Sequence, residues 1–171
     1  MALRSASPNP NITFLDDVNA VRDVIRGEVN QCCDVVVVAH SLGTVVGASA
    51  IKATSSANSH ESEAEKCAVE GAKIGHVIGF VAVGTGFLPS GVCFLRALGG
   101  TPPPLWRFSS EPLVSTDEDV EDDGENTTTK KFVTIRVSAR DAFYHDLPVE
   151  EGKEWVERLA PQGAATVAQG G

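Results

Sequence analysis

Residues 34–43 read Asp34-Val35-Val36-Val37-Val38-Ala39-His40-Ser41-Leu42-Gly43, and this stretch decides the fold of the 171-residue chain. Four consecutive valines after a polar residue predict a strand that is buried on both faces, as in a parallel sheet. The residues that follow, 44–51, are small and mostly apolar, which predicts a helix packed closely on that sheet. The stretch therefore indicates an α/β fold in which a buried strand leads directly into a helix.

Ser41 lies at the predicted turn between this strand and this helix. A serine at such a turn is typical of a nucleophile elbow, which holds the serine in a strained backbone conformation. The turn needs small residues two positions before and after the serine, and Ala39 and Gly43 meet that need. The N-terminus of the helix would direct backbone N–H groups at negative charge developing beside Ser41. The alternative is a buried turn whose serine only caps the helix.

The flanking residues complete a crossover unit of an α/β sheet. Upstream, apolar residues recur at steps of three or four, which predicts an amphipathic helix over residues 14–30. Downstream, the near-continuous apolar run within residues 73–84 predicts a second parallel strand. Because open α/β sheets bind ligands at the carboxyl edge of their strands, we expect the Ser41 side chain near residues 84–86.

A small antiparallel element is predicted further along the chain. Residues 87–115 carry prolines and glycines, so no long regular elements are expected there, and their apolar side chains could cover a pocket. Residues 132–137 alternate between apolar and polar types, which predicts a strand. That strand would pair as a hairpin with residues 105–108 or with residues 112–115.

One more helix is predicted in the C-terminal part of the chain. It opens at Val149 and ends before Pro161. We therefore expect an α/β core over residues 1–86, a cap-like segment over residues 87–162 and a flexible tail over residues 163–171.

The charge of the chain is concentrated in one segment. The net charge is −9, and seven of the 23 acidic residues lie between positions 117 and 125. The segment 116–129 that contains them is predicted to be a disordered, solvated insertion, because it has almost no apolar side chains. The other 16 acidic residues nearly balance the 14 lysines and arginines. With no basic patch, nucleic acid is not an expected partner.

Composition indicates a cytoplasmic protein. An apolar content of 42% and a charged content of 22% are ordinary for a globular domain. The N-terminus lacks the apolar region of a signal peptide, and no run approaches the roughly 18 apolar residues of a membrane span. The four cysteines show no C-x-x-C pairing and are expected to be reduced. No metal, cofactor or membrane partner is expected, and no oligomeric state is predicted.

Two segments resemble the α/β-hydrolase superfamily. Residues 17–47 combine the helix, the valine strand and the turn at Ser41. The segment 141–148, Asp141-Ala142-Phe143-Tyr144-His145-Asp146-Leu147-Pro148, is similar to the start of the cap helix in small serine hydrolases related to plant methylesterases and hydroxynitrile lyases. The resemblance covers about residues 12–165. It implies a partial α/β-hydrolase, with a few-stranded parallel sheet, helices and a small cap that contains a β-hairpin and a helix.

The resemblance also implies a site and an activity. Ser41 matches the nucleophile, and the backbone N–H of Leu42 matches one oxyanion donor. The implied reaction is esterase-like acyl hydrolysis of a small apolar or aromatic ester-like substrate. The residues expected around that substrate are His40, Thr85, Phe87, Tyr144 and Trp155.

The rest of the catalytic site has no counterpart in the chain. In the family, a second oxyanion donor precedes this region, and the catalytic acid and histidine follow the cap. We do not expect His40, His76 or His145 to replace that histidine, because a base must come within about 3 Å of the serine oxygen. The chain is therefore expected to be an incomplete hydrolase, weakly active or inactive alone. The alternatives are a non-catalytic small-molecule-binding or protein-interaction module derived from a hydrolase, and a misassembled gene product.

Overall fold

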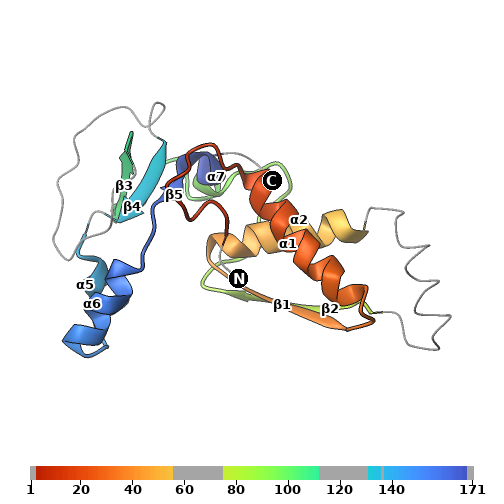
Figure 1. Ribbon diagram of the computed structural model, residues 1–171. Helices are drawn as coiled ribbons and strands as arrows, with labels where there is room; N and C mark the ends of the chain where they lie inside the picture. Colours follow the sequence, from red (N-terminus) through yellow and green to blue (C-terminus); the bar gives the residue numbers. More distant parts are fainter. Residues whose placement is uncertain (1–2, 56–74, 112–130, 136, 169–171) are drawn as a thin grey trace. The chain divides into compact units, whose positions relative to one another are not determined.

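The computed structural model describes residues 3–55, 75–111, 131–135 and 137–168 (Figure 1). The chain forms two compact units. The first, which we call the elbow unit, is built from Phe14–Phe94, and the second, the hairpin unit, from Met1–Thr13 and Leu95–Gln169. The predicted acidic insertion over residues 116–129 lies outside the described residues.

The elbow unit is a strand–helix–strand crossover preceded by a helix. Its elements are α1 (Phe14–Val29), β1 (Val35–His40), α2 (Leu42–Ser55) and β2 (Val77–Val83). β1 and β2 pair in parallel, with Val35 opposite Val77 at one end and His40 opposite Val83 at the other. The sequence-based predictions of the first helix, the valine strand, the following helix and a second parallel strand are confirmed.

The helix α2 packs closely on the sheet because Gly47 has no side chain. A Cβ at this position would lie 3.0 Å from Cε2 of Phe80 and 3.6 Å from Cβ of Ala39. On the same helix, Val46 and Ala50 are fully buried. The close approach predicted from the small residues of this segment is therefore observed.

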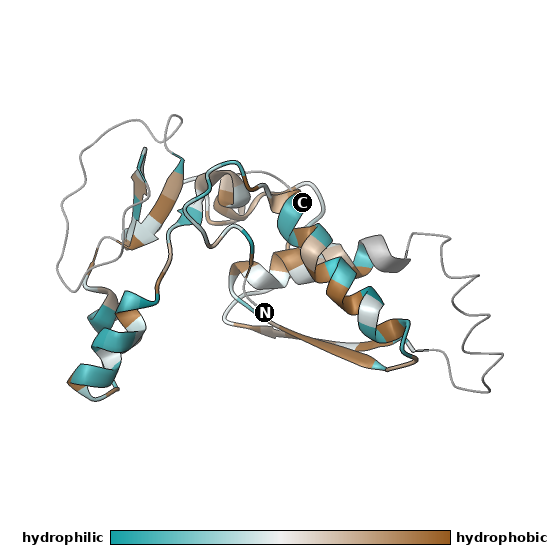
Figure 2. Ribbon diagram, in the orientation of Figure 1, coloured by the Kyte–Doolittle hydropathy of each residue, from teal (hydrophilic) through white to brown (hydrophobic). Residues whose placement is uncertain are grey.

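The two strands are covered on one face only within the elbow unit. Both α1 and α2 lie on the same side of β1 and β2 (Figure 1). The side chains of the other face, which we call the open face, are 44% to 67% exposed: Val36, Val38, Ile78, Val81 and Val83. These strands appear in the hydrophobic colours of Figure 2. The prediction that the valine strand is buried on both faces is wrong, because both helices of this unit pack on the same face.

The hairpin unit is built on a small antiparallel sheet. Its elements are α4 (Phe94–Ala97, starting at the boundary between the units), β3 (Trp106–Ser109), β4 (Phe132–Ile135), α5 (Ala139–Phe143), α6 (Val149–Glu157), β5 (Gln162–Gly163) and α7 (Ala164–Ala168). β3 pairs with β4 from Trp106 opposite Ile135 to Ser109 opposite Phe132. This is the first of the two predicted hairpins. The second would use residues 112–115, which lie outside the described residues.

The C-terminal residues are structured where a flexible tail is predicted. Gln162 and Gly163 pair with β4, and α7 follows directly. The Gly163 N–H also donates to the carbonyl of Ser5 at 3.0 Å, and the Ala164 N–H donates to the carbonyl of Lys131 at 2.7 Å. The prediction fails for residues 163–168 because these hydrogen bonds come from distant backbone, and composition carries no sign of them.

The expectation that all four cysteines are reduced is also wrong. Cys32 is disulfide-bonded, whereas Cys33 and Cys93 are free. Cys32 lies in the turn between α1 and β1 with φ of 60°, and it is half-buried.

The packing of the hairpin unit predicts a difference between two phenylalanines. Phe132 on β4 is 2% exposed, and Phe143 at the end of α5 is 46% exposed. We expect Phe132→Ala to lower the free energy of unfolding by about 3–5 kcal/mol, because it leaves a cavity in the core. Phe143→Ala removes the same atoms from an exposed position and should cost about 1 kcal/mol or less. Urea denaturation measures both, and equal losses would contradict the described packing.

Candidate active site

Ser41 is the single residue between β1 and α2, and its backbone is left-handed. Its φ is 51°, a conformation that costs an L-residue roughly 1–2 kcal/mol. Among the described residues, Cys32 is the only other non-glycine residue with positive φ. The prediction that Ser41 has an unusual backbone conformation at the end of the strand is confirmed.

Hydrogen bonds on both sides hold Ser41 in this turn. Its N–H donates to the carbonyl of Val83 at 2.9 Å, which joins it to the end of β2 just before Gly84. Its carbonyl accepts from the N–H of Thr44 at 2.9 Å. The Thr44 hydroxyl donates to the carbonyl of Ala39 at 3.3 Å. The turn is thus fixed to the helix after it, to the strand before it and to the neighbouring strand.

The hydroxyl of Ser41 makes no hydrogen bond within the described part of the chain. A serine that caps a helix accepts from the N–H of the second or third helical residue. Here the N–H of Thr44, the third residue of α2, donates to the Ser41 carbonyl instead. This geometry disagrees with the alternative in which Ser41 only caps the helix, and it leaves the hydroxyl available.

The N-terminus of α2 adds unpaired donors beside Ser41. The N–H groups of Leu42 and Gly43 find no acceptor among the described residues, as is usual for the first turn of a helix. A helix of 14 residues also carries a partial positive charge at this end. Together these features favour negative charge next to Ser41.

His40 contacts the turn that follows β2. It ends β1 and alternates with Val36 and Val38, so it belongs to the exposed side of the strand. A Cβ at Gly84 would lie 3.2 Å from Nε2 of His40, so the imidazole lies against this glycine. Gly84 itself has φ of 72°, which favours glycine.

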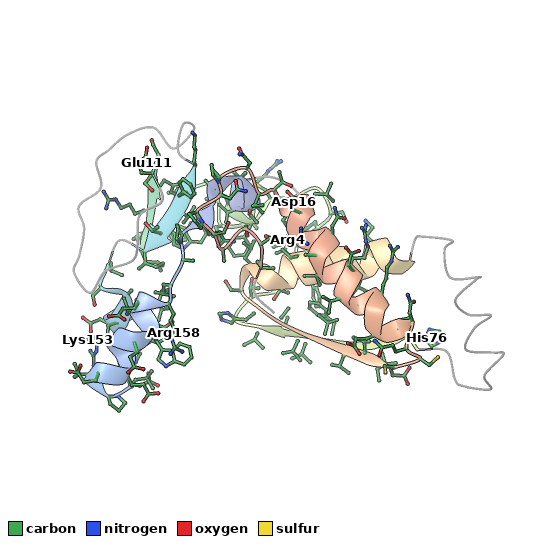
Figure 3. All side chains as sticks on the ribbon, in the orientation of Figure 1. Arg4, Asp16, His76, Glu111, Lys153 and Arg158 are labelled. Carbon is green, nitrogen blue, oxygen red and sulfur yellow. The ribbon has the colours of Figure 1, made fainter. Side chains whose placement is uncertain are left out.

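His76 lies at the opposite end of the sheet from Ser41. It comes directly before β2, where its N–H donates to Oδ1 of Asp34 at 3.2 Å and its carbonyl accepts from the N–H of Val35 at 2.8 Å. Figure 3 shows it near the C-terminal end of α1. The length of β1 at about 3.3 Å per residue separates it from Ser41 by roughly 20 Å. His76 therefore cannot act as a base on Ser41.

Phe87 follows the turn after β2 that is joined to Ser41. It is 66% exposed, and its ring lies 5.4 Å from that of Phe80, centroid to centroid. Phe80 in turn contacts α2 at Gly47. Half-buried Thr85 lies between Gly84 and Phe87. Of the predicted pocket residues, the elbow unit thus contains His40, Thr85 and Phe87.

The remaining predicted pocket residues belong to the hairpin unit. Tyr144 follows α5 and Trp155 lies on α6, and their rings stack with centroids 6.4 Å apart. The guanidinium carbon of Arg158, which is labelled in Figure 3, lies 4.9 Å from the centroid of the Trp155 ring. His145 is exposed in the turn between the two helices. The structure brings Tyr144 and Trp155 together with each other, in a different unit from Ser41.

Metal-ligand clusters and membrane-spanning helices are not seen in the described ranges. No three His, Cys, Asp or Glu side chains gather there as metal ligands do. None of the helices in those ranges is long and apolar enough to cross a membrane.

A parallel α/β unit in which a serine at positive φ joins a strand to a helix is the backbone arrangement typical of the α/β-hydrolase fold. Comparison with known families agrees, because the family described as "Alpha/beta hydrolase family" matches residues 3–170. The chain therefore belongs to the α/β hydrolase family. The match supports the superfamily expected from the sequence and specifies no branch within it. No curated protein and no solved structure matches the chain.

The turn after β2 predicts a contrast between two neighbouring glycines. Gly84→Ala places a Cβ at φ of 72° and within 3.2 Å of Nε2 of His40. It should lower the free energy of unfolding by about 1–2 kcal/mol, the usual penalty for a left-handed L-residue. At Gly86 a Cβ would meet nothing within 4 Å, so Gly86→Ala should be neutral or slightly stabilising. Thermal or urea unfolding of both variants tests this, and a costly Gly86→Ala would contradict the described turn.

Proposed function

We propose that the chain is a serine hydrolase of the esterase type, with Ser41 as its nucleophile. The observation that carries the proposal is the backbone of Ser41, held at φ of 51° between a strand and a helix. Its unbonded hydroxyl and the unpaired N–H of Leu42 support the same role. The reaction class is the one expected from the resemblance, within a family that the chain belongs to.

In the proposed reaction, the Ser41 oxygen bonds to the carbonyl carbon of an ester and loses its proton to a solvent water molecule. The electron pair of the carbonyl bond moves to the carbonyl oxygen, whose negative charge the Leu42 N–H stabilises. When the carbonyl reforms, the ester C–O bond breaks and the alcohol leaves with a proton. Water then attacks the acyl-serine and releases the acid.

The proton of Ser41 limits the rate that the chain can reach. A serine hydroxyl is a weak nucleophile unless a base accepts its proton. In the described part of the elbow unit, His40 lies against Gly84 and His76 lies at the far end of the sheet. We therefore propose slow acyl transfer for residues 1–171 alone.

The substrate that we propose is a small ester with an apolar or aromatic acyl group. The exposed ring of Phe87, beyond the turn that is joined to Ser41, supports an apolar partner. No charged residue occurs in the segment 77–87, which contains β2 and this turn. An anionic or cationic acyl group would therefore gain nothing from this part of the elbow unit.

A second candidate function is a non-catalytic binding module. The expectation that neither His40 nor His76 acts as a base on Ser41 favours it. So does the stacked pair of Tyr144 and Trp155 on the hairpin unit, which offers an aromatic surface to a small molecule. In this case Ser41 would be chemically inert, and binding would depend on the hairpin unit.

A fluorophosphonate probe distinguishes the two functions, because it modifies activated serines. Under the hydrolase proposal, the probe should label Ser41 slowly but in preference to every other serine, as peptide mass spectrometry would show. Ser41→Ala should abolish the labelling. Ser49→Ala, which changes another serine of α2, should leave it intact. Labelling spread evenly over many serines, or none at all, would reject the hydrolase proposal.

Ester hydrolysis by this chain should be weak. Enzymes that lose triad members keep about 10³–10⁴-fold acceleration over water, and losing one oxyanion donor costs a further 10²–10³-fold. With one donor identified and neither His40 nor His76 expected to act as a base, hydrolysis of p-nitrophenyl acetate should exceed the buffer rate by about 10²-fold at most. Ser41→Ala should change this rate little, because the remaining acceleration comes from the oxyanion donor and from substrate binding. A rate thousands of fold above buffer would contradict this expectation, because it would require a base that accepts the Ser41 proton.

A further inference from the structure

One buried polar side chain distinguishes α2 from an ordinary apolar helix. Thr44 is fully buried, although every other buried residue of α2 is apolar. These neighbours are Leu42, Val45, Val46, Gly47 and Ala50. A hydroxyl removed from water among such residues is costly unless it forms a hydrogen bond. The hydrogen-bond partner of the Thr44 hydroxyl therefore indicates the structural role of this residue.

The Thr44 hydroxyl donates to a carbonyl outside its own helix. Oγ1 lies 3.3 Å from the carbonyl oxygen of Ala39, five residues earlier in the chain. Threonines inside helices instead bond three or four residues back, within the helix itself. Ala39 belongs to β1, so the bond links the helix to the strand across the Ser41 turn.

The backbone of the same residue holds the other side of the turn. The N–H of Thr44 donates to the carbonyl of Ser41 at 2.9 Å. Thr44 therefore bonds to Ser41 and, two residues before it, to Ala39. Ser41 is in an unfavourable left-handed conformation, which persists only where the surrounding structure fixes it.

We propose that Thr44 is a positioning residue for Ser41, and that its hydroxyl sets the direction of the Ser41 side chain and of the Leu42 N–H. Without this bond, the Ala39 carbonyl loses its link to the helix, and the turn can relax toward a less strained backbone. The expected effect of Thr44 on the reactivity of Ser41 rests on the proposed function. The expected effect of Thr44 on the backbone of the turn is independent of that function.

The test compares three threonine variants. Thr44→Val removes the hydroxyl and keeps the shape of the side chain, and Thr44→Ser restores a hydroxyl. Thr166→Val is the matched control, because Thr166 is fully buried in α7 and its hydroxyl has no hydrogen-bond partner among the described residues. Labelling of Ser41 by the fluorophosphonate should slow at least about tenfold in Thr44→Val, since small misplacements are costly in catalysis. It should recover most of its rate in Thr44→Ser and stay unchanged in Thr166→Val.

A second readout follows the backbone and needs no chemistry at Ser41. Hydrogen exchange of the Ser41 N–H, which donates to Val83, should become about 3- to 10-fold faster in Thr44→Val, as loss of one hydrogen bond predicts. Exchange at Ala50, further along α2, serves as the reference for global unfolding. Thr44→Ser and Thr166→Val should match the wild-type protein.

The two readouts fail separately. If the probe does not label wild-type Ser41 but its amide responds as expected, the hydrolase proposal fails and the positioning role stands. If exchange of the Ser41 amide is unchanged in Thr44→Val relative to Ala50, the positioning role is overturned. It is also overturned if Thr44→Ser behaves like Thr44→Val, because the hydroxyl would then not be the cause.

Discussion

The parallel pairing of β1 with β2 is the constraint on which the elbow unit depends. Parallel strands end at the same edge of a sheet, so the residue after β1 and the turn after β2 must meet there. The hydrogen bond from the Ser41 N–H to the Val83 carbonyl connects the two strand ends at this edge. A crossover helix has to leave from the same edge, and for that reason the first N–H groups of α2 lie beside Ser41. The strained serine, its donors and the neighbouring turn are thus consequences of one pairing.

The sequence correctly predicts the features that depend on the pattern of residue types at neighbouring positions. The valine run, the small residues on both sides of Ser41 and the 3.6-residue repeat of α1 each report on a few neighbouring positions. The antiparallel pairing of β3 with β4 is a more distant contact, but alternation in residues 132–137 reveals one strand and limits its partners. The strained turn at Ser41 was predictable because the elbow requires specific small residues.

The features that the sequence does not reveal depend on what lies across from a residue in space. A run of valines predicts a strand, but nothing in it shows that both neighbouring helices pack on one face. Gly163 to Ala168 are small and without periodicity, and their structure comes from backbone partners at Ser5 and Lys131. Threonine is an ordinary residue for the first turn of a helix, and only the structure shows that the Thr44 hydroxyl donates to a carbonyl of the preceding strand.

The open face has a consequence for how the protein behaves in concentrated solution. Its aliphatic side chains are exposed. In the described part of the chain, β1 and β2 also each have one edge that pairs with no other strand. Such an edge is a template for pairing between molecules, and neither β1 nor β2 contains an Asp, Glu, Lys or Arg that would oppose it. The opposing force is the repulsion between molecules that each carry a net charge of −9. Because salt reduces the range of that repulsion to about 10 Å at 0.1 M, added salt should promote association of this protein.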